Sequence, residues 1–319
     1  PAINPLDYAA NFADFLKDRP ANQPFFFWFG ATEAHRAFEK GAGQPSGVNP
    51  AEVHVPGFLP DTPEMREDIA DYIREIEYHD QHLARMLTLL EQRNELDRTL
   101  IIVTSDNGMP FPRAKANLYD WGTRMPLAIR WPGRIPPGRV VEDFVSHTDL
   151  GPTVLEAAGL PAMTGATGRS LVPLLASSRQ GLVDPRRTAA VTAHERHTWC
   201  RPNGAPYPMR ALRTRDFLYI RNFEPDRWPA GDPDFESPHQ GAWGDVDNGP
   251  AKTFLIEHRE RFPKHFEWAF GKRPAEELYE VRRDPANIHN LAENPQFTNV
   301  LKQIRRDLDR ELARTGDPR

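Results

Sequence analysis

The chain has 319 residues, of which 39% are hydrophobic and 27% are charged, a composition that is ordinary for a globular protein and ample for a buried core. Its net charge of −5 argues against a nucleic-acid binder, although an acidic protein can still hold a local basic pocket for an acidic sugar. No apolar run approaches the roughly 20 residues that a membrane span needs, and a single cysteine excludes an internal disulfide framework.

The first elements expected along the chain are two helices with a strand between them. Residues 7–18 have the apolar spacing of an amphipathic helix. The aromatic run at 25–29 predicts a strand buried on both faces, which ends at Gly30 shortly before His35. Residues 63 to about 93 predict a long amphipathic helix that begins at a proline. Its apolar stripe would consist of Ile69, Ile73, Ile76, Leu83, Leu87 and Leu90.

Two short apolar runs, at 100–104 and 126–131, predict further strands. The order strand, helix, strand predicts a parallel βαβ crossover. Ligands of such sheets bind beyond the carboxyl ends of the strands. His35 and Asp106 each come just after a predicted strand, so we expect both side chains at the same rim of the sheet.

A change of composition predicts a domain boundary near residue 180. Residues 146–160 have a helical pattern that ends at Gly159, a residue suited to a helix C-terminus. Residues 161–188 are rich in Gly, Ser, Pro and Arg, which indicates a surface connection. We therefore predict a larger domain over 1–180 and a smaller one over 181–319.

The second part is expected to be a small antiparallel sheet with one helix. Strands are predicted at 189–192, in a hairpin over 210–222 and at 277–281, whereas 224–275 is predicted to be rich in loops. A final helix is predicted at about 295–314. Its inner face would carry Phe297, Val300, Leu301, Ile304, Leu308 and Leu312.

The turn after the strand at 100–104 is the strongest candidate for chemistry. Asp106 and Asn107 place carboxylate and amide oxygens side by side, and Gly108 lets the turn splay them, which suits a hard cation such as Ca²⁺. Lys115 is placed to meet an anion beside that cation. The alternatives are an Asx-type turn that only closes the strand and a solvated loop lysine.

Residues 102–119, IVTSDNGMPFPRAKANLY, resemble the sulfatase family and most of all its heparan N-sulfatase branch. The resemblance spans nearly all of the chain and implies an alkaline-phosphatase-like α/β fold, a mostly parallel sheet flanked by helices, with a smaller C-terminal α+β domain. It also implies Ca²⁺-dependent hydrolysis of sulfated sugars, as in glycosaminoglycan degradation. Further matching segments are EAHR at 33–36, HTDL at 147–150, AGL at 158–160, YPMRALR at 207–213, ELYEV at 277–281, DP at 284–285 and NL at 290–291.

The resemblance assigns roles to four of these residues. Asp106 and Asn107 match the pair that binds Ca²⁺ together with upstream aspartates that are absent here. Lys115 matches a basic position that contacts the sulfate. His35 matches a histidine that contacts the sulfate and assists the leaving group, and a histidine is a suitable proton donor near neutral pH. The alternative for His35 is a packed loop residue.

Substrate-binding roles are expected for a second set of residues. Arg36 is expected to pair with a substrate carboxylate or sulfate, with a surface salt bridge as the alternative. His194, Glu195 and Arg210 lie in segments that resemble parts of the branch near the substrate. In a sugar pocket a glutamate accepts from hydroxyl or amine groups and an arginine holds an acidic group. The alternative is that they are polar residues of an edge strand.

The nucleophile that the family resemblance implies is missing from this sequence. Sulfatases have a C-x-P-[ST]-x-R-type segment whose cysteine becomes formylglycine. Cys200 begins a C-x-P segment, but this segment lacks the arginine of the motif and follows the Asp-Asn turn instead of preceding it. We therefore expect Cys200 to be a small buried residue. An N-terminal part of the same protein, with the formylglycine, is expected as the partner that this chain needs for stability and activity.

The resemblance favours N-sulfoglucosamine of heparan-type glycans as substrate. Alternatives are an O-sulfated sugar or aryl sulfate, a phosphate ester, or glycan binding without catalysis. Phosphohydrolases of this fold usually present Asp-His at the turn to hold zinc, so Asn107 argues against that alternative. The resemblance also favours a periplasmic, secreted or lysosomal-type compartment, and a homo-oligomer is possible.

Overall fold

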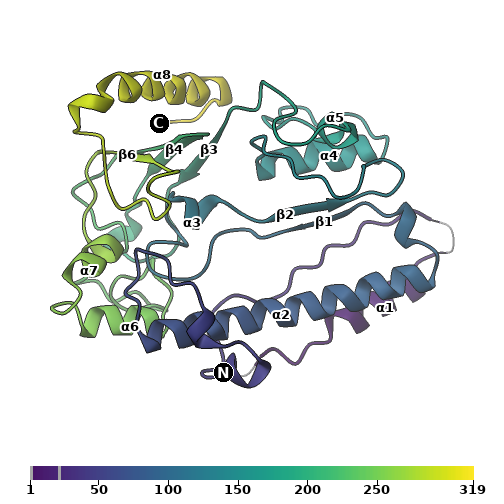
Figure 1. Cartoon of the computed structure of the whole chain (residues 1–319), viewed down its shortest axis with the longest axis horizontal. Coiled ribbons are helices and arrows are strands. Elements are labelled where there is room, and N and C mark those ends of the chain that lie inside the picture. Colours follow the sequence, from purple (N-terminus) through teal and green to yellow (C-terminus); the bar gives the residue numbers. More distant parts are fainter. Residues whose placement is uncertain (1–2, 21–22) are drawn as a thin grey trace. The chain divides into compact units, whose positions relative to one another are not determined.

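The computed structural model describes residues 3–20 and 23–319, which form two compact units. The first unit contains residues 3–20, 23–99, 110–112 and 246–270, and the second contains 100–109, 113–245 and 271–319. Figure 1 labels the elements along the chain. The boundary predicted near residue 180 falls within the second unit, so the division into 1–180 and 181–319 stays a prediction. Within the described ranges, no helix is both long and apolar enough to cross a membrane.

Helices build the first unit. α1 (Tyr8–Asp18) and α2 (Pro63–Gln92) confirm the two helices predicted near the start of the chain. Asp7 caps α1 by accepting from the Ala10 N–H at 2.9 Å. α6 (Pro250–Glu257) and α7 (Pro263–Phe270) interrupt the stretch 224–275, which is otherwise loop among the described residues, as predicted. Both helices begin at a proline, a start signal that the loop prediction overlooked. The first unit also contains short 3₁₀ helices at Gln44–Ser46, Pro50–Glu52 and Leu96–Arg98.

The buried face of α2 is more polar than its sequence pattern predicts. Ile69 and Leu90 are buried as expected, but Ile76 is 43% exposed. Asp71, by contrast, is buried. Its carboxylate accepts from the main-chain N–H groups of Gly41 and Gly43 at 2.8 and 2.9 Å. Its neighbours on the same face include the buried polar residues Asp68, Glu75 and His82.

The aromatic run at 25–29 is extended, but it is not the doubly buried strand that its composition predicts. Exposure alternates along it: Phe25, Phe27 and Phe29 are half-buried, whereas Phe26 and Trp28 are 69% and 80% exposed. One face packs on α1 and α2, and the other face is largely exposed. The predicted parallel crossover from this run to the strand at 100–104 is therefore not formed.

Two antiparallel sheets belong to the second unit. β1 (Ile101–Thr104) pairs with β2 (Leu127–Arg130), which confirms both predicted strands. The register joins Ile101 to Arg130 and Thr104 to Leu127. The second sheet has the order β3 (Ala189–His194), β4 (Met209–Thr214), β5 (Phe217–Asn222), β6 (Glu276–Glu280). In the described part of the chain every strand pair is antiparallel, so the expectation of a mostly parallel sheet is not met there.

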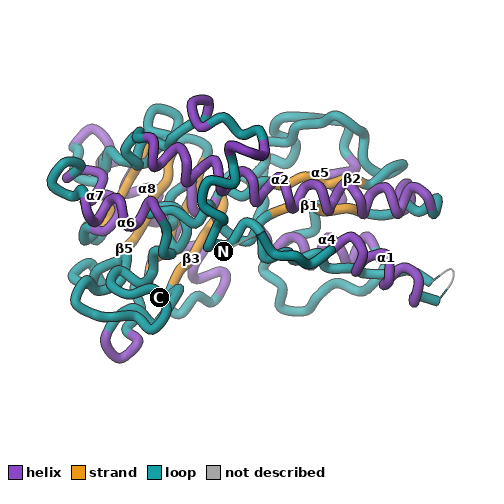
Figure 2. Tube along the Cα trace, turned by 90° about the horizontal axis from the view of Figure 1, so that it is seen from below, coloured by secondary structure: helices purple, strands orange, loops and turns teal. Residues whose placement is uncertain are grey.

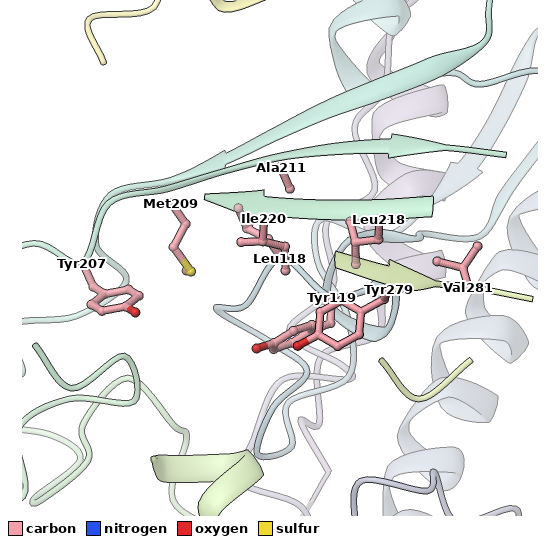
Figure 3. Packing of buried hydrophobic residues seen from close by; sticks show 9 residues of the cluster. All are labelled: Leu118, Tyr119, Tyr207, Met209, Ala211, Leu218, Ile220, Tyr279 and Val281. Carbon is pink, nitrogen blue, oxygen red and sulfur yellow. The ribbon is translucent and has the colours of Figure 1, made fainter. Parts of the chain in front are cut away.

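The four-stranded sheet has an apolar cluster on each face. α8 (Thr298–Thr315) lies along one face, as Figure 1 and Figure 2 both show, and confirms the predicted final helix. Its Leu301, Ile304, Leu308 and Leu312 pack with Leu212, Tyr219 and Leu278, as the helical spacing predicts. The other cluster, in Figure 3, joins residues of β4, β5 and β6 to the loop that follows β1. Its members are Leu118, Tyr119, Tyr207, Met209, Ala211, Leu218, Ile220, Tyr279 and Val281.

The segment between the two sheets contains short helices. α3 (Asp120–Thr123) follows the loop after β1, and the predicted helix at 146–160 is a 3₁₀ turn at His147–Asp149 that continues into α4 (Leu150–Ala157). Gly159 has φ +70° and ends this helix, with the Leu160 N–H donating to the Leu155 carbonyl at 2.9 Å. The predicted surface connection contains α5 (Val172–Ala176).

Candidate active site

Asp106 and Asn107 form a tight turn directly beyond β1. The Asn107 N–H donates to Asp106 Oδ1 at 2.9 Å, and Ser105 Oγ donates to the Asn107 carbonyl at 3.0 Å. Asp106 is exposed and Asn107 is half-buried. The first of these hydrogen bonds joins adjacent residues, whereas the Asx-type turn considered from sequence would reach the N–H two residues on. The backbone nevertheless holds the carboxylate and the amide of the two residues in one turn, which is compatible with ligation of a cation.

Two glycines lock this turn to the chain that follows it. The Gly108 N–H donates to the Gly122 carbonyl at 3.0 Å. A Cβ atom at Gly108 would lie 1.8 Å from the Trp121 carbonyl oxygen. A Cβ atom at Gly122 would lie 2.4 Å from the carbonyl oxygens of Ala114 and Asn117. Three stretches of main chain therefore meet at distances that only glycine allows. Gly108 is needed for this close packing as well as for the backbone freedom predicted from the sequence.

Lys115 belongs to the same compact loop. Its N–H donates to the Met109 carbonyl at 3.1 Å, and Asn117 Nδ2 donates to the Lys115 carbonyl at 3.1 Å. Ala116 has φ +63°, which bends the chain sharply next to the lysine. The structure thus brings Asp106, Asn107 and Lys115 into one loop. Oxygen ligands and an ammonium group in one loop can together hold a cation and an oxyanion.

The donor set fits a hard cation in kind but not in number. Ca²⁺ takes about six to eight oxygen ligands, mostly from carboxylates, amides, carbonyls and water. Across residues 3–20 and 23–319, no group of three or more His, Cys, Asp and Glu side chains is placed to hold a metal ion. Asp106 and Asn107 would therefore supply only part of a Ca²⁺ coordination sphere.

His35 and Arg36 lie in a loop of the first unit. His35 is exposed, and its ring Nδ1 lies 2.6 Å from the Arg36 carbonyl oxygen. Arg36 Nη1 and Nη2 donate to the Asp68 carboxylate at 2.8 and 2.7 Å, and its Nε donates to the Pro110 carbonyl at 2.8 Å. Since His35 and Asp106 belong to different units, the shared rim expected for them stays a prediction.

The environment of Arg36 is closely built. Its guanidinium lies 4.4 Å from the ring centres of both Phe38 and Phe111, and its side chain is only 4% exposed. A Cβ atom at Gly249 would lie 2.4 Å from Arg36 Nη1. Arg36 is thus a buried residue of the protein interior, and its predicted substrate contact stays a prediction. Asp68 was not predicted from the sequence, although an aspartate beside apolar residues of a helix is a signal of a buried pair.

Glu195 and Arg210 are brought together by the pairing of β3 with β4. Arg210 Nη2 lies 2.7 Å from the Glu195 carboxylate, and Arg210 Nε lies 2.7 Å from Asp317. Arg319 also binds Glu195, at 2.8 Å, and lowers the pKa of its carboxyl group together with Arg210. The Arg210 side chain is 3% exposed, so its charge is balanced inside the protein by two carboxylates. No local sequence pattern indicated that Asp317 would contact Arg210 or that Arg319 would contact Glu195.

His194 lies at the end of β3, opposite Met209. Both of its ring nitrogens are buried, and neither has a hydrogen-bond partner among the described residues. Burial lowers the pKa of its imidazole, which keeps the ring neutral near pH 7. A neutral imidazole can donate one hydrogen bond and accept another, but both nitrogens are buried here, so the substrate contact expected for His194 stays a prediction.

Cys200 is a buried thiol, as expected from the sequence. It is 0% exposed, and burial raises its pKa to about 12. Because the thiolate is the nucleophilic form, the side chain is inert. Its Cβ lies in close contact with the chain at Gly231 and Gly244, where added Cβ atoms would approach it to 3.1 and 2.9 Å. Cys200 therefore serves packing.

Comparison with known proteins identifies the family. Residues 6–160 match the Sulfatase family model. The chain is 30% identical to human N-sulphoglucosamine sulphohydrolase over 93% of this chain and 62% of the relative, and 25% identical to an ulvan-active sulfatase of Formosa agariphila over 91% and 45%. A solved structure concerned with glycosaminoglycan metabolism in Bacteroides thetaiotaomicron superposes with a TM-score of 0.65 at 17% identity, over 98% of this chain and 58% of that one.

The chain thus spans between about half and two thirds of the length of the relatives it matches. The structural neighbour shares the alkaline-phosphatase-like fold of sulfatases, which confirms the predicted fold class. The similarity to the human relative covers nearly the whole chain and supports the N-sulfatase-like branch. Residues 6–160 carry a sulfatase domain, and the chain is similar to proteins of the sulfatase family over nearly its whole length.

Proposed function

We propose that the protein of which this chain is part is a Ca²⁺-dependent sulfatase that hydrolyses N-sulfoglucosamine units of heparan-type glycans. The observation that carries the proposal is the loop that holds Asp106, Asn107 and Lys115 together beyond β1. The 30% identity to a human N-sulphoglucosamine sulphohydrolase supports the choice of substrate. The nucleophile, a formylglycine, would come from a part of the protein that lies outside these 319 residues.

Each residue of the loop has a defined task in this proposal. The oxygens of Asp106 and Asn107 would hold the cation, which would supply positive charge beside the sulfate. The Lys115 ammonium neutralises the charge that builds up on the sulfuryl oxygens when the bond to sulfur breaks. His35 gives a proton to the departing nitrogen, so that a neutral amine leaves.

Sugar recognition is assigned to the edge of the four-stranded sheet. The Glu195 side chain is 44% exposed, so it can accept from a hydroxyl or amine group of the sugar while Arg210 holds it in place. A sugar contact by His194 stays a prediction, because both of its ring nitrogens are buried. Arg210 is fully engaged by Glu195 and Asp317, so its task is to position Glu195.

Activity of the natural gene product toward N-sulfoglucosamine is the first test. We expect Asp106→Ala, Asn107→Ala and Lys115→Ala each to lower kcat/KM by about 100-fold or more, because each removes charge stabilisation of the transition state. Lys302→Ala is the matched control, since Lys302 is exposed on α8. A chelator should abolish turnover, and added Ca²⁺ should restore it.

Three results would contradict the proposal in different ways. Preference for an O-sulfated sugar would change the substrate but keep the reaction. Zinc-dependent hydrolysis of a phosphate ester would replace the reaction. Glycan binding without turnover, with no aldehyde-bearing residue found by peptide mass spectrometry, would make the protein a non-catalytic binder.

A further inference from the structure

The turn at 284–287 lies between β6 and α8 in the second unit. The Asp284 carboxylate accepts from the Ile288 and His289 N–H groups at 2.9 and 2.8 Å. The main-chain N–H and the Nδ2 group of Asn287 both donate to the Asp284 carbonyl at 3.0 Å. Asn287 is 0% exposed and has φ +52°, a left-handed conformation that asparagine adopts more readily than most residues. The turn is therefore closed around a buried asparagine.

Asn287 binds the loop of Lys115 on both sides of the lysine. Its main-chain carbonyl accepts from Arg113 Nη2, and Arg113 precedes the lysine by two residues. Its side-chain Oδ1 accepts from the Asp120 N–H at 3.0 Å, and Asp120 follows the lysine by five residues. Both contacts lie within the second unit. One buried residue therefore fixes the two ends of the stretch that carries Lys115.

Neighbouring contacts attach the same loop to the same part of the fold. Trp121 Nε1 donates to the Pro285 carbonyl, in the turn, at 3.2 Å. Tyr119 Oη donates to Glu277 Oε2, on β6, at 2.7 Å. The Arg113 guanidinium lies 3.9 Å from the ring centre of Tyr119. The loop after β1 is thus joined to the turn and to β6 by several separate contacts, and Asn287 makes two of them.

The chain between these two fixed ends is bent next to the lysine. Ala116 has φ +63°, a conformation that is unfavourable for alanine. Such a conformation persists only where the surrounding structure holds the chain on both sides of it. The contacts of Asn287 with Arg113 and Asp120 supply this constraint. Release of one end would let the bend relax and would turn the Lys115 side chain away from its present direction.

We propose that Asn287 is a positioning residue for Lys115: it fixes both ends of residues 113–120 and so sets where the lysine ammonium lies. This inference rests on the proposed function, in which Lys115 neutralises charge on the sulfate. Asn287 is 0% exposed, so it acts through the lysine and makes no contact with substrate itself. A catalytic group displaced by about 1 Å can cost about 100-fold in rate, so a buried turn behind the loop can control turnover.

Hydrogen–deuterium exchange of the natural gene product tests the attachment without an activity assay. Asn287→Gly removes the side-chain contacts without straining the main chain, because glycine adopts positive φ freely. We expect the amides of residues 113–120 to exchange about 10-fold faster in this variant than in the parent.

Asn290→Ala is the matched control, three residues further along the chain. The Asn290 side chain binds main-chain groups of Glu276, Leu278 and Ala292, at 3.1, 2.9 and 3.0 Å, so its loss should loosen the same region and leave the exchange of residues 113–120 unchanged. Equal exchange of residues 113–120 in the two variants would overturn the proposal.

Kinetics of the natural gene product separate positioning from stability. We expect Asn287→Gly to lower kcat by about 10-fold or more with little change in KM, because the lysine acts in the transition state. Asn290→Ala should keep the kcat of the parent even where its Tm falls as much. Asn287→Asp retains an acceptor for the Asp120 N–H, so its kcat should stay within about 3-fold of the parent. A loss in Asn287→Asp as large as that in Asn287→Gly would overturn the proposal.

A double-mutant cycle shows whether Asn287 acts through the lysine. In the Lys115→Ala background, Asn287→Gly should lower kcat by less than about 2-fold, because the group that it positions is already absent. Losses that multiply fully would overturn the proposal, since Asn287 would then act independently of Lys115.

The two proposals fail separately. Unchanged exchange of residues 113–120 in Asn287→Gly, in a protein that hydrolyses N-sulfoglucosamine, would remove the positioning role and leave the proposed function. Faster exchange in that variant, in a protein that hydrolyses no sulfated sugar, would leave Asn287 as the residue that fixes the Lys115 loop and remove the proposed function.

Discussion

Arg36 and Asp68 form a buried ion pair with two hydrogen bonds, at 2.8 and 2.7 Å, within the first unit. Their side chains are 4% and 1% exposed, and Asp68 also accepts from the Ala251 N–H at 3.0 Å. The pair thus joins the loop that contains His35 to α2 and to the first residues of α6. Arg36, expected to contact the substrate, has a structural task in holding that loop.

Removing the negative charge of this pair should be strongly destabilising. We expect Asp68→Asn to lower the free energy of unfolding by about 3 kcal/mol or more, because a buried guanidinium then lacks its counter-charge. Arg310→Ala breaks an exposed pair with Asp307 and should cost less than about 1 kcal/mol. Urea denaturation of both variants measures the difference, and comparable small losses would show that the Arg36 charge is satisfied in another way.

Gly108 should tolerate no side chain. Because a Cβ there would lie 1.8 Å from the Trp121 carbonyl oxygen, Gly108→Ala must displace the chain that carries Asp106 and Asn107. We expect a loss of about 2–4 kcal/mol in stability, with weaker Ca²⁺ binding in the natural gene product.

The control for this variant is a glycine with room around it. The nearest atom to a Cβ at Gly151 in α4 is 3.7 Å away, so Gly151→Ala should be neutral or stabilising by up to about 1 kcal/mol. Thermal denaturation compares the two variants. If Gly108→Ala behaved like the control, the close packing of the turn would not be needed for its conformation.

Glu75 should make the first unit less stable as the pH rises. Burial raises the pKa of its carboxyl group from 4.5 to about 7, with further contributions from the charges of Glu33, Glu39 and Asp71. The folded state then binds more protons than the unfolded state between these two pH values, so the free energy of unfolding falls across that interval.

A neutral replacement should remove this dependence. Glu75→Gln should gain on the order of 2 kcal/mol relative to the parent at about pH 7.5 and little at about pH 4.5. Urea denaturation at a series of pH values gives both curves. Parallel curves for the variant and the parent would mean that Glu75 titrates normally.

The last residues of the chain should support the proposed sugar-binding edge. Asp317→Asn leaves Arg210, whose side chain is 3% exposed, with Glu195 as its remaining carboxylate, and should cost about 1–3 kcal/mol in stability. If Arg210 positions Glu195, the same variant should raise KM for the sugar with little change in kcat. Asp307→Asn on α8 is the control. An unchanged KM in both variants would show that the Arg210–Glu195 pair takes no part in substrate binding.

Local patterns were sufficient for most of the individual elements. The spacing of apolar residues predicted α1, α2, α8 and all six strands to within a few residues, because these elements bury one face or form adjacent pairs. The Asp-Asn turn after β1 was also visible, since an apolar strand that ends in acidic and amide residues is a local signal. α6 and α7 were missed because short helices in a proline-rich stretch have weak periodicity.

Long-range relationships were not available from the sequence. The aromatic composition at 25–29 was interpreted as burial on both faces, whereas the structure covers only one, because packing depends on which neighbours are present. Likewise, no spacing rule connects Arg36 to Asp68, or Arg210 to Asp317, since these partners are 32 and 107 residues apart.

The sequence by itself therefore determined the type and position of most elements and the burial of Cys200, and it predicts the chemistry of the Asp106–Asn107 turn with Lys115. These depend on residue type and near neighbours in the chain. The tertiary structure decided which charges are used internally and which faces stay bare: Arg36 and Arg210 are neutralised by distant carboxylates, and Trp28 is left exposed. The physical reason is that desolvation and ion pairing depend on what surrounds a side chain in space, and sequence spacing does not specify those surroundings.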